Sequence, residues 1–509
     1  MRKLPESSKM SLLLREGEGS SESPSNGSLK RKRADTETSR TLETVATGDI
    51  HDLICVGFGP ASLAIAVALH DALEQANHTS SKPKVCFLEQ QPEFRWHAGM
   101  MLPDAKMQIS FLKDLAIQRN PRSHFTFLNY LKIKNRLTQF TNLGTFLPTR
   151  LEFSDYMKWC SSAFADVVEY GSEVVKVDIV KSQADAIKYD LLSVESCKSN
   201  GEITTRRTRN LVIAVGGRPQ IPTVLPQNHP RVIHSSVYAS QISNLLKVRD
   251  KAYNIGVIGS GQSAAEVFND LHSRYPNAHT CMIFRDTALR PSDDSPFVNE
   301  IFDDERIAPF FNLPESARSA LVAADKSTNY SVVQSELLEK IYHNLYQQNV
   351  IESDKSQHKH KLYPSSEVVD LVDVPQNKRV NLILKRLNHI GPRKAGKETL
   401  NLDALIYATG YARDTHNKLL EECQVINASN SGQWEVRRDY RAKLDRGFVV
   451  DDLNIYLQGC NEASHGLSDS LISVLATRGG EVVESIFGEG LRKTEEMNGD
   501  ARPAVEGMF

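Results

Sequence analysis

The chain has 509 residues, a net charge of −2 and a hydrophobic fraction of 40%, and its length suits about two to four globular domains. This balanced charge gives no general attraction to nucleic acid or membrane surfaces, so we expect neither as a partner. The longest uncharged apolar run, residues 53–69, contains Gly-Phe-Gly-Pro and is short for a membrane span. No apolar stretch follows the first basic residues, so no signal peptide is expected.

Cysteine usage favours a reducing compartment. The seven cysteines are scattered, odd in number and never spaced Cys-x-x-Cys, which predicts buried free thiols in the cytoplasm rather than disulfides. The fifteen histidines form no His-Glu-x-x-His or Cys/His cluster, so no metal site is expected.

Residues 1–48 are rich in Ser, Glu, Thr, Lys and Arg and poor in apolar residues. Such a segment cannot bury enough surface to offset the entropy of ordering, so a disordered tail is predicted. Within it, residues 30–33 (Lys-Arg-Lys-Arg) are either a nuclear-import patch or a solvated run of charge.

The first organised stretch follows this tail. Residues 53–56 predict a short buried strand, Gly57 and Gly59 a tight turn, and residues 60–69 an apolar helix that opens on a proline. A strand that enters a helix through Gly-x-Gly is typical of dinucleotide binding, because the glycines let the backbone approach a pyrophosphate at the helix N-terminus. Ser62 occupies the third glycine position and is small enough for the helix to pack on the strand.

A second strand pattern, residues 84–88, ends in Glu89. An acid at this strand end accepts hydrogen bonds from a ribose hydroxyl, and the polar residues 75–83 predict a loop that lengthens the unit. Residues 90–114 mix aromatic and polar side chains directly after the strand. Such a segment either wraps a cofactor or is a surface excursion, and spacing alone does not decide between the two.

Helical and strand patterns follow up to the next glycine turn. We expect helices at residues 123–134 and 149–164 and strands at residues 167–180 and 203–216. The last strand ends in paired glycines, as expected where a strand runs up to a cofactor.

The opening pattern then recurs. Residues 254–258 predict a strand, residues 259–264 (Gly-Ser-Gly-Gln-Ser-Ala) a second glycine turn, and a helix continues to residue 271. The next strand, residues 280–284, ends in Arg285 rather than in an acid. A carboxylate would repel the 2′-phosphate of NADP, whereas a guanidinium pairs with it bidentately. The alternative is an exposed arginine at a strand end without this role.

The remaining elements are less regular. After a loop at residues 290–302, we expect helices at residues 317–330 and 335–348 and strands at residues 380–385 and 402–411. A last helical piece, residues 465–486, opens with polar residues at 466–470, whose backbone N–H groups could hold an anion or a carbonyl.

Two glycine turns, one followed by an acid and the other by an arginine, imply two nucleotides, and FAD in the first with NADPH in the second is the simplest assignment. The predicted fold class is α/β, with two Rossmann-like dinucleotide-binding domains and a smaller, mainly helical substrate-binding region. The chain lacks a Cys-x-x-Cys pair, so a disulfide reductase is excluded. There remains a flavin that reacts with oxygen or one that passes electrons to a partner.

The expected division follows from these patterns. It comprises a disordered tail (1–48), an FAD-binding domain (49–223), an NADPH-binding domain (253–400), a substrate-binding region that returns to the FAD site (224–252 and 401–489) and a flexible tail (490–509).

Six strings carry a resemblance. They are residues 57–62 (Gly-Phe-Gly-Pro-Ala-Ser), 107–114 (Met-Gln-Ile-Ser-Phe-Leu-Lys-Asp), 259–264, 290–300 (Arg-Pro-Ser-Asp-Asp-Ser-Pro-Phe-Val-Asn-Glu), 408–411 (Ala-Thr-Gly-Tyr) and 465–470 (His-Gly-Leu-Ser-Asp-Ser). In order over residues 50–489, the chain resembles the fungal L-ornithine N(5)-monooxygenases, class B flavin monooxygenases that begin hydroxamate siderophore synthesis. Residues 234–236 (His-Ser-Ser) lack the preceding Phe-x-Gly, which disfavours the sulfur- or carbon-oxidising relatives.

The resemblance implies three sets of binding residues and no catalytic side chain, since the chemistry would be that of the flavin. The FAD set is Gly57, Gly59, Ser62, Glu89, Gln90, Trp96, His97, Gln108 and Val174, with Leu467, Ser468 and Asp469 against the ring. The NADPH set is Ser260, Gly261, Gln262, Ser263, Arg285, Asn329, Tyr330 and Ser331. The ornithine set is Lys113, Asn299, Glu300, Ile301, Phe302, Asn329 and Ser470.

The implied reaction is hydroxylation of the neutral δ-amine of L-ornithine by a C4a-hydroperoxyflavin, with NADPH and O2 consumed. The resemblance also suggests a homotetramer. A lysine N(6)-hydroxylase of the same branch is the runner-up, because one methylene separates the two substrates. An FAD- and NADPH-binding redox sensor that has lost turnover is the alternative from another class.

Overall fold

The computed structural model describes residues 42, 45, 48–76, 82–226, 228–374, 378–387, 396–429 and 431–498. The predicted tail at residues 1–48 and the predicted loop at residues 75–83 fall largely outside these residues, as do residues 499–509. Residues 490–498 of the predicted C-terminal tail are helical instead, because the last long helix continues to Asn498. Among the described residues, no helix combines the length and apolar character that a membrane crossing needs. All seven cysteines are free, and five of them are buried, as predicted.

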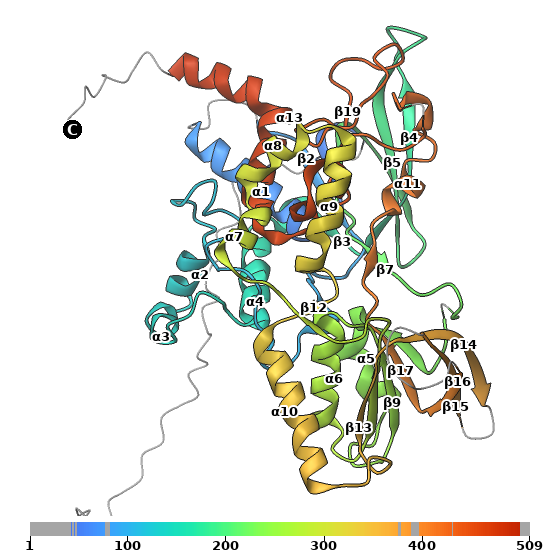
Figure 1. Ribbon diagram of the computed structural model, residues 1–509. Coiled ribbons are helices and arrows are strands. Elements are labelled where there is room, and N and C mark those ends of the chain that lie inside the picture. Colours follow the sequence, from blue (N-terminus) through green and yellow to red (C-terminus); the bar gives the residue numbers. More distant parts are fainter. Residues whose placement is uncertain are drawn as a thin grey trace, which may run out of the picture. The chain divides into compact units, whose positions relative to one another are not determined.

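The first sheet is built around the strand that precedes the first glycine turn (Figure 1). Its strand order is β3-β2-β1-β6-β5-β4, with β19 paired to β6. The long strand β6 pairs in parallel with β1 on one side. On its other side the first half of β6 pairs antiparallel with β5 and its second half pairs in parallel with β19. The strands are β1 (Ile50–Val56), β2 (Val85–Glu89), β3 (Val168–Tyr170), β4 (Ser172–Lys181), β5 (Tyr189–Lys198), β6 (Ile203–Ile213) and β19 (Asn454–Leu457).

Two apolar layers enclose this sheet. On one face α1 (Pro60–Gln75), α4 (Arg150–Ser162) and α13 (Leu475–Asn498) contribute to one core. Helices α1 and α13 approach closely, because a Cβ at Gly479 would lie 2.7 Å from the Ala64 carbonyl oxygen. On the opposite face, side chains of β4 and β5 form a second apolar core together with residues 419–453. Short helices α2 (Phe127–Ile133), α3 (Leu137–Asn142) and α11 (Thr415–Leu419) lie at the periphery.

The second sheet is fully parallel, with the order β13-β10-β9-β17-β8. Its helical face carries α5 (Tyr238–Leu245), α6 (Gln262–Arg274) and α10 (Ser335–Ile351). Its other face packs against a three-stranded antiparallel sheet, β14-β15-β16. The strands are β8 (Val232–His234), β9 (Asn254–Ile258), β10 (His279–Ile283), β13 (His360–Tyr363), β14 (Ser366–Val374), β15 (Arg379–Arg386), β16 (Lys397–Leu402) and β17 (Ala404–Tyr407).

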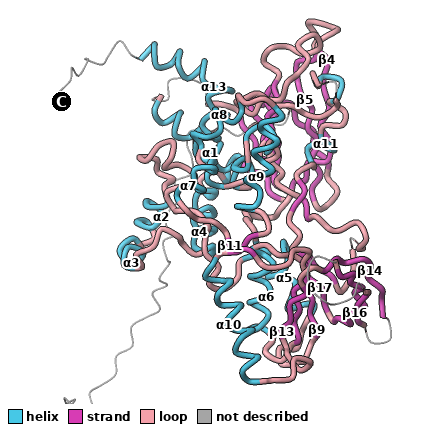
Figure 2. The backbone as a smooth tube through the Cα atoms, viewed as in Figure 1, coloured by secondary structure: helices cyan, strands magenta, loops and turns pink. Residues whose placement is uncertain are grey.

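The segments between the two sheets form short strands and helices. Figure 2 shows α8 and α9 among the helices of the upper part, and two 3-10 helices, residues 300–302 and 304–306, lie between α7 and α8. The two-stranded pairs are β7 (Arg218–Pro219) with β18 (Tyr411–Ala412), and β11 (Arg290–Pro291) with β12 (Val332–Val333). The helices are α7 (Pro296–Asn299), α8 (Ile307–Phe311), α9 (Glu315–Asn329) and α12 (Glu462–His465). Helix α12 packs against both α8 and α9, so this segment meets the residues that follow β19.

The predicted α/β class is confirmed, and both glycine turns join a buried strand to a helix. Several predicted elements are wrong in extent. The helix at residues 123–134 begins only at Phe127, because the Thr126 side chain caps it. The strand at residues 167–180 is broken at Gly171, whose φ is +69°, and the strand at 402–411 ends at Tyr407.

The C-terminal helical prediction needs a larger correction. Residues 465–486 are not one helix, because short 3-10 helices at residues 467–470 and 472–474 precede α13, which begins at Leu475. The sequence patterns also miss β5, β14 and β16, whose mixed polar faces give weak alternation. They miss β8, β13 and β19 as well, which have only three or four residues each.

Candidate active site

The carboxyl ends of the parallel strands in the first sheet converge on Gly57. Its N–H donates to the Leu88 carbonyl oxygen at 2.8 Å, and its φ is +89°. A Cβ here would lie 2.6 Å from the Ala214 carbonyl oxygen, whereas one at Gly59 would meet nothing within 4 Å. One glycine therefore fits against its neighbouring strand while the other leaves open space before the N-terminus of α1, which suits a pyrophosphate. Ser62 is fully buried in the first turn of the helix.

Glu89, the last residue of β2, is buried and holds this turn by hydrogen bonds. Its Oε2 accepts the Phe58 N–H at 2.7 Å and its Oε1 accepts the Gln91 N–H at 2.8 Å. Each carboxylate oxygen retains a lone pair for a further donor. The acid therefore holds the glycine turn and still has the capacity to accept a ribose hydroxyl.

The other predicted FAD residues differ in what they offer. His97 has a left-handed backbone with φ +45°, and its ring lies 5.0 Å from the Trp96 ring, centroid to centroid. Gln90 and Gln108 are exposed and donate to none of the described residues. Val174 is buried in the core of the first sheet, so its side chain contributes packing there.

The second glycine turn repeats the first on the other sheet. The Gly259 N–H donates to the Ile283 carbonyl oxygen at 3.0 Å, and φ is +138°. A Cβ at Gly259 would lie 2.5 Å from the Ala408 carbonyl oxygen. Ser260 and Ser263 are half-buried at the start of α6.

Four further residues of the predicted NADPH set lie at or near this turn. A Cβ at Gly261 would lie 3.6 Å from the Ser331 Cα, so the two backbones are adjacent. Gln262 accepts the Gln334 N–H at 2.9 Å. Arg285 lies two residues beyond the end of β10, is exposed, and makes no hydrogen bond or ion pair with the described residues. Its guanidinium is therefore available to an anion.

Lys113 and the segment after α7 meet although they are far apart in sequence. The Lys113 Nζ donates to Asp303 Oδ1 at 2.7 Å. Asp303 directly follows the predicted ornithine residues Asn299, Glu300, Ile301 and Phe302. The Phe302 carbonyl oxygen accepts the Ser473 hydroxyl at 3.2 Å, which ties the segment to the 3-10 helix just before α13.

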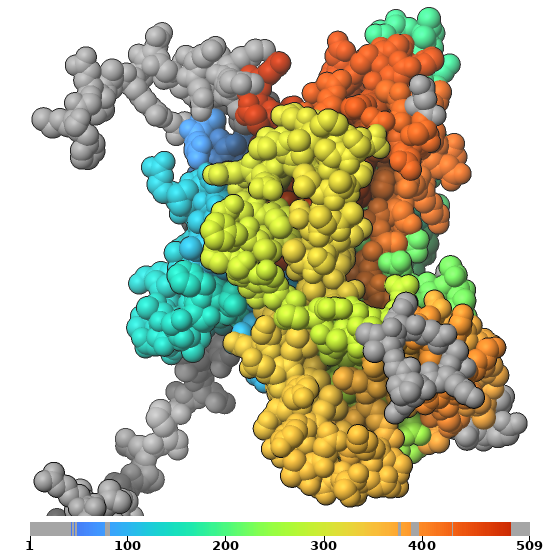
Figure 3. Space-filling view, viewed as in Figure 1, coloured from blue at the N-terminus to red at the C-terminus, as the bar shows by residue number. Residues whose placement is uncertain are grey.

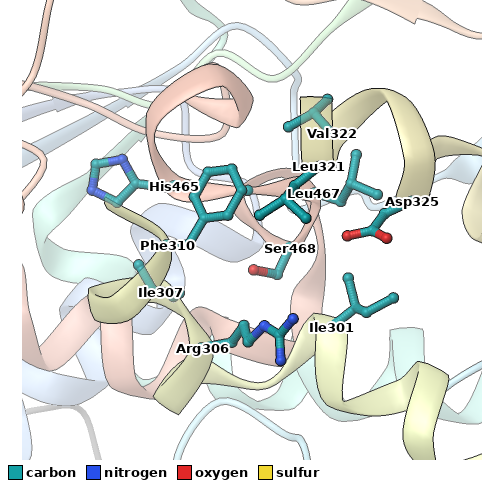
Figure 4. Close-up of a pocket in the computed structure, with 11 residues that line it drawn as sticks. Ile301, Arg306, Ile307, Phe310, Leu321, Val322, Asp325, His465, Leu467 and Ser468 are labelled. Atoms are coloured by element: carbon teal, nitrogen blue, oxygen red, sulfur yellow. The ribbon is translucent and has the colours of Figure 1, made fainter. Parts of the chain in front are cut away.

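A small cavity lies between this segment and the C-terminal residues 465–468 (Figure 4). Its volume is about 20 Å³, which is room for about one water molecule. Ile301, Leu467 and Ser468 all line it, so two predicted sets meet there. Arg306 and Asp325 add one charge of each sign to the lining. In Figure 3 the yellow segment that contains α9 lies in front of red C-terminal residues.

Asp469 has a structural role that its type alone does not reveal. It is fully buried, and its Oδ1 lies 3.1 Å from Arg478 Nη1, itself only 3% exposed. Its Oδ2 accepts the Asn461 N–H at 2.6 Å. The carboxylate therefore fixes the turn that carries Leu467 and Ser468.

Asn329, Tyr330 and Ser470 lie where two segments touch. Asn329 ends α9, which contacts both the 467–470 turn and β12. The Tyr330 hydroxyl donates to Glu462 Oε2 at 2.6 Å. The structure thus brings the end of the predicted NADPH set to the predicted flavin-ring residues.

Sequence reasoning missed two ion pairs that support the site. Arg150 forms a bidentate pair with Glu266 at 2.8 and 2.9 Å, and Glu266 also accepts from Gln262 at 2.9 Å. This pair links the helix α4 of the first sheet to the second glycine turn. The other is the contact between Lys113 and Asp303. For this contact, the only signal in the sequence is the acid directly after residues 299–302. Two partners that are 190 residues apart leave no periodic pattern.

Comparisons with known proteins agree with this geometry. A family model described as L-lysine 6-monooxygenase/L-ornithine 5-monooxygenase matches residues 49–413. The L-ornithine N(5)-monooxygenase of Emericella nidulans is 52% identical over 89% of this chain and 93% of its own. That of Arthroderma benhamiae is 50% identical over 89% of this chain and 91% of its own.

Solved structures are similar as well. The ornithine hydroxylase of Pseudomonas aeruginosa matches with a TM-score of 0.78 and 37% identity, covering 86% of this chain and 99% of that one. The ornithine N-hydroxylase of Kutzneria sp. 744, solved with reduced FAD, NADP+ and L-ornithine, matches with a TM-score of 0.77 and 33% identity, covering 87% of this chain and all of that one. The chain therefore belongs to the L-lysine 6-monooxygenase/L-ornithine 5-monooxygenase family.

Proposed function

We propose that this chain hydroxylates the side-chain amine of L-ornithine to N(5)-hydroxy-L-ornithine, with FAD as resident cofactor and NADPH and O2 as co-substrates. The product would enter hydroxamate siderophore synthesis. The observation that carries the proposal is the contact of Lys113 with Asp303, the residue that follows residues 299–302. Ile301 of that segment lines the same cavity as Leu467 and Ser468.

The first glycine turn is the FAD site in this proposal. Gly57 and Gly59 would face the pyrophosphate, Ser62 would let α1 pack closely, and Glu89 would accept from the ribose. Residues Gln90, Trp96, His97, Gln108 and Val174 would line the rest. When bound, FAD would pass two electrons from NADPH to O2, so that one oxygen atom goes to the amine and the other leaves as water.

The second glycine turn would hold NADPH. The N-terminus of α6, residues 260–263, would receive the pyrophosphate. Arg285 would pair with the 2′-phosphate, since its guanidinium has no partner among the described residues. Asn329, Tyr330 and Ser331 would complete the site, because Ser331 lies against Gly261.

Ornithine would be held by its charged end. Lys113 would pair with the α-carboxylate, with Asn299, Asn329 and Ser470 as hydrogen-bonding partners. The δ-amine must reach the flavin neutral in order to act as a nucleophile. Ile301 and Leu467 would present apolar side chains beside it. No protein nucleophile is required.

Hydroxylation of L-lysine is the second candidate function, because the family description includes both activities. One methylene in a pocket discriminates by about 1–3 kcal/mol. The relatives from Emericella nidulans and Arthroderma benhamiae are both ornithine enzymes by name, which favours ornithine.

We also propose a homotetramer in the cytoplasm. Helix α10 exposes Tyr342, Tyr346 and Val350 by 75%, 58% and 65%, and their spacing of four places them on one helix face. An exposed apolar stripe of this kind suits a subunit contact. The seven free thiols suit a reducing compartment. The domain limits at 49–223, 253–400, and 224–252 with 401–489 are part of the same proposal, in which β8, α5 and β17 from the last two segments complete the second sheet.

The proposed function is tested by product formation. Purified protein loaded with FAD is given NADPH and O2 with L-ornithine, and in parallel with L-lysine. We expect a hydroxylamine product with ornithine and much less with lysine. Equal or greater product with lysine would assign the lysine activity, and NADPH consumption without O2 uptake or product would favour the redox sensor.

A further inference from the structure

The contact between Lys113 and Asp303 leaves both groups with unused hydrogen-bonding capacity. Their side chains are 27% and 42% exposed, and the Nζ to Oδ1 distance is 2.7 Å. An ammonium has three donors and a carboxylate about four acceptor positions. One shared hydrogen bond therefore leaves a cation and an anion side by side, both open to solvent and to a ligand.

Asp303 is held in place by its own segment. It is extended, with φ −81° and ψ 147°, between the 3-10 helices at residues 300–302 and 304–306. The carbonyl oxygen before it accepts the Ser473 hydroxyl, and the carboxylate of Asp304, after it, accepts the Thr477 hydroxyl. Since both neighbours are tied to the C-terminal helical region, Asp303 presents its carboxylate from a fixed backbone while Lys113 reaches it on a flexible side chain.

This arrangement of charges is complementary to the head group of an α-amino acid. That head group carries a carboxylate and an ammonium on the same carbon, so each can face the opposite charge of the pair. A lysine alone would attract any carboxylate equally well. The carboxylate beside it adds an attraction for the α-ammonium and weakens the attraction for a ligand that carries a carboxylate alone.

We propose that Asp303 is a specificity residue: through its contact with Lys113 it favours substrates that carry an α-ammonium beside the α-carboxylate over those that carry the carboxylate alone. This inference rests on the proposed function, in which Lys113 receives the carboxylate. It assigns to Asp303 a role that the sequence motifs do not cover, since the predicted ornithine residues end at Phe302.

The test compares two ligands on the holoenzyme. L-ornithine and 5-aminopentanoate have the same carbon chain and terminal amine, and only ornithine has the α-ammonium. Dissociation constants are measured by calorimetry on FAD-loaded protein with NADP+ for the unchanged chain, Asp303→Asn and Glu305→Gln. Glu305 is the matched control, because it is an exposed acid of the same segment whose side chain contacts none of the described residues.

We expect the preference for ornithine over 5-aminopentanoate to fall by about tenfold or more in Asp303→Asn, as for the loss of one charge-assisted hydrogen bond. Glu305→Gln should keep the preference of the unchanged chain. The inference is overturned if Asp303→Asn weakens both ligands equally, leaves their ratio unchanged, or shifts it no more than Glu305→Gln does. Flavin content and melting temperature of each variant identify a folding defect, and Asp303→Ser then replaces Asn in the same comparison.

Turnover separates this inference from the proposed function. If the unchanged chain forms no hydroxylated ornithine, the proposed function is wrong. If it does and the ligand ratio is unaffected by Asp303→Asn, only the role of Asp303 is wrong.

Discussion

The two glycine turns have the same backbone geometry but differ in the residue that follows the next strand. In both, a Cβ on the first glycine would collide with a carbonyl oxygen of the adjacent strand, at 2.6 Å for Gly57 and 2.5 Å for Gly259. Glu89 is buried and bonds to the backbone of its own turn. Arg285 is exposed and makes no contact of this kind with the described residues. The acid after the first turn is therefore already bonded within the protein, whereas the guanidinium after the second is free for a ligand.

This difference matches the two proposed cofactors. A resident flavin benefits from a turn that is already ordered, because less entropy is lost on binding. A nicotinamide nucleotide exchanges at each turnover. Its binding group must therefore be accessible, so that the nucleotide can enter and leave. The difference also defines substitutions that should affect one turn without the other.

The largest effect is expected from alanine at the first glycine of each turn. Gly57→Ala should abolish FAD binding, because the methyl group would overlap a backbone oxygen and alanine disfavours a φ of +89°. Gly259→Ala should purify with flavin but should not be reduced by NADPH. Flavin absorbance of the purified proteins and its bleaching by NADPH check both. A Gly259→Ala protein that lost its flavin and kept its fold would contradict the assignment of separate sites.

Next in size is Lys113→Ala. Without the ammonium that receives the α-carboxylate, the KM for ornithine should rise by about tenfold or more, while NADPH oxidation persists. Steady-state rates of product and of NADPH consumption are measured against ornithine concentration. An unchanged KM would remove Lys113 from the substrate site.

Arg285→Ala should weaken NADPH binding by about 1–3 kcal/mol, the value of one charge-assisted contact. NADH, which lacks the 2′-phosphate, should be used as before. The ratio of kcat/KM for the two nucleotides reports the effect. Retention of the original preference for NADPH would show that another group reads the phosphate.

The smallest effect is a pH dependence of stability. His465 is 1% exposed, and burial lowers its pKa from 6.5 to about 4. Its Nε2–H donates to the Arg438 carbonyl oxygen at 3.1 Å. Because the unfolded chain binds the proton near pH 6.5 and the folded chain only near pH 4, this contribution is complete above pH 6.5 and is lost as the pH falls toward 4.

Thermal unfolding at neutral and mildly acidic pH measures it. His465→Gln should lose less stability on acidification than the unchanged chain. An equal loss in both proteins would assign the effect to other buried histidines.

The glycine turns were predictable because local sequence determines them. Gly57 and Gly259 each follow a short run of β-branched and apolar residues and precede a helix, so a few residues fix strand, turn and helix together. The substrate position was predictable only through resemblance. Lys113 and Asp303 meet from distant parts of the chain, and no local periodicity records such a pairing.

The wrong extents have a similar cause. The 3-10 turns at residues 467–474 replace a regular helix because Arg478 and Asn461 bind Asp469, a tertiary contact that overrides helix propensity. The break at Gly171 was visible as a glycine, but its left-handed φ depends on the transition from β3 to β4.

The central claim is that one chain binds FAD and NADPH so that their reactive ends meet. It is tested most directly by mixing the purified, FAD-loaded protein with NADPH in the absence of oxygen and following the flavin absorbance. We predict that the flavin is bleached stoichiometrically and regains its colour when oxygen is admitted. A flavin that stays oxidised in the presence of excess NADPH would contradict the claim.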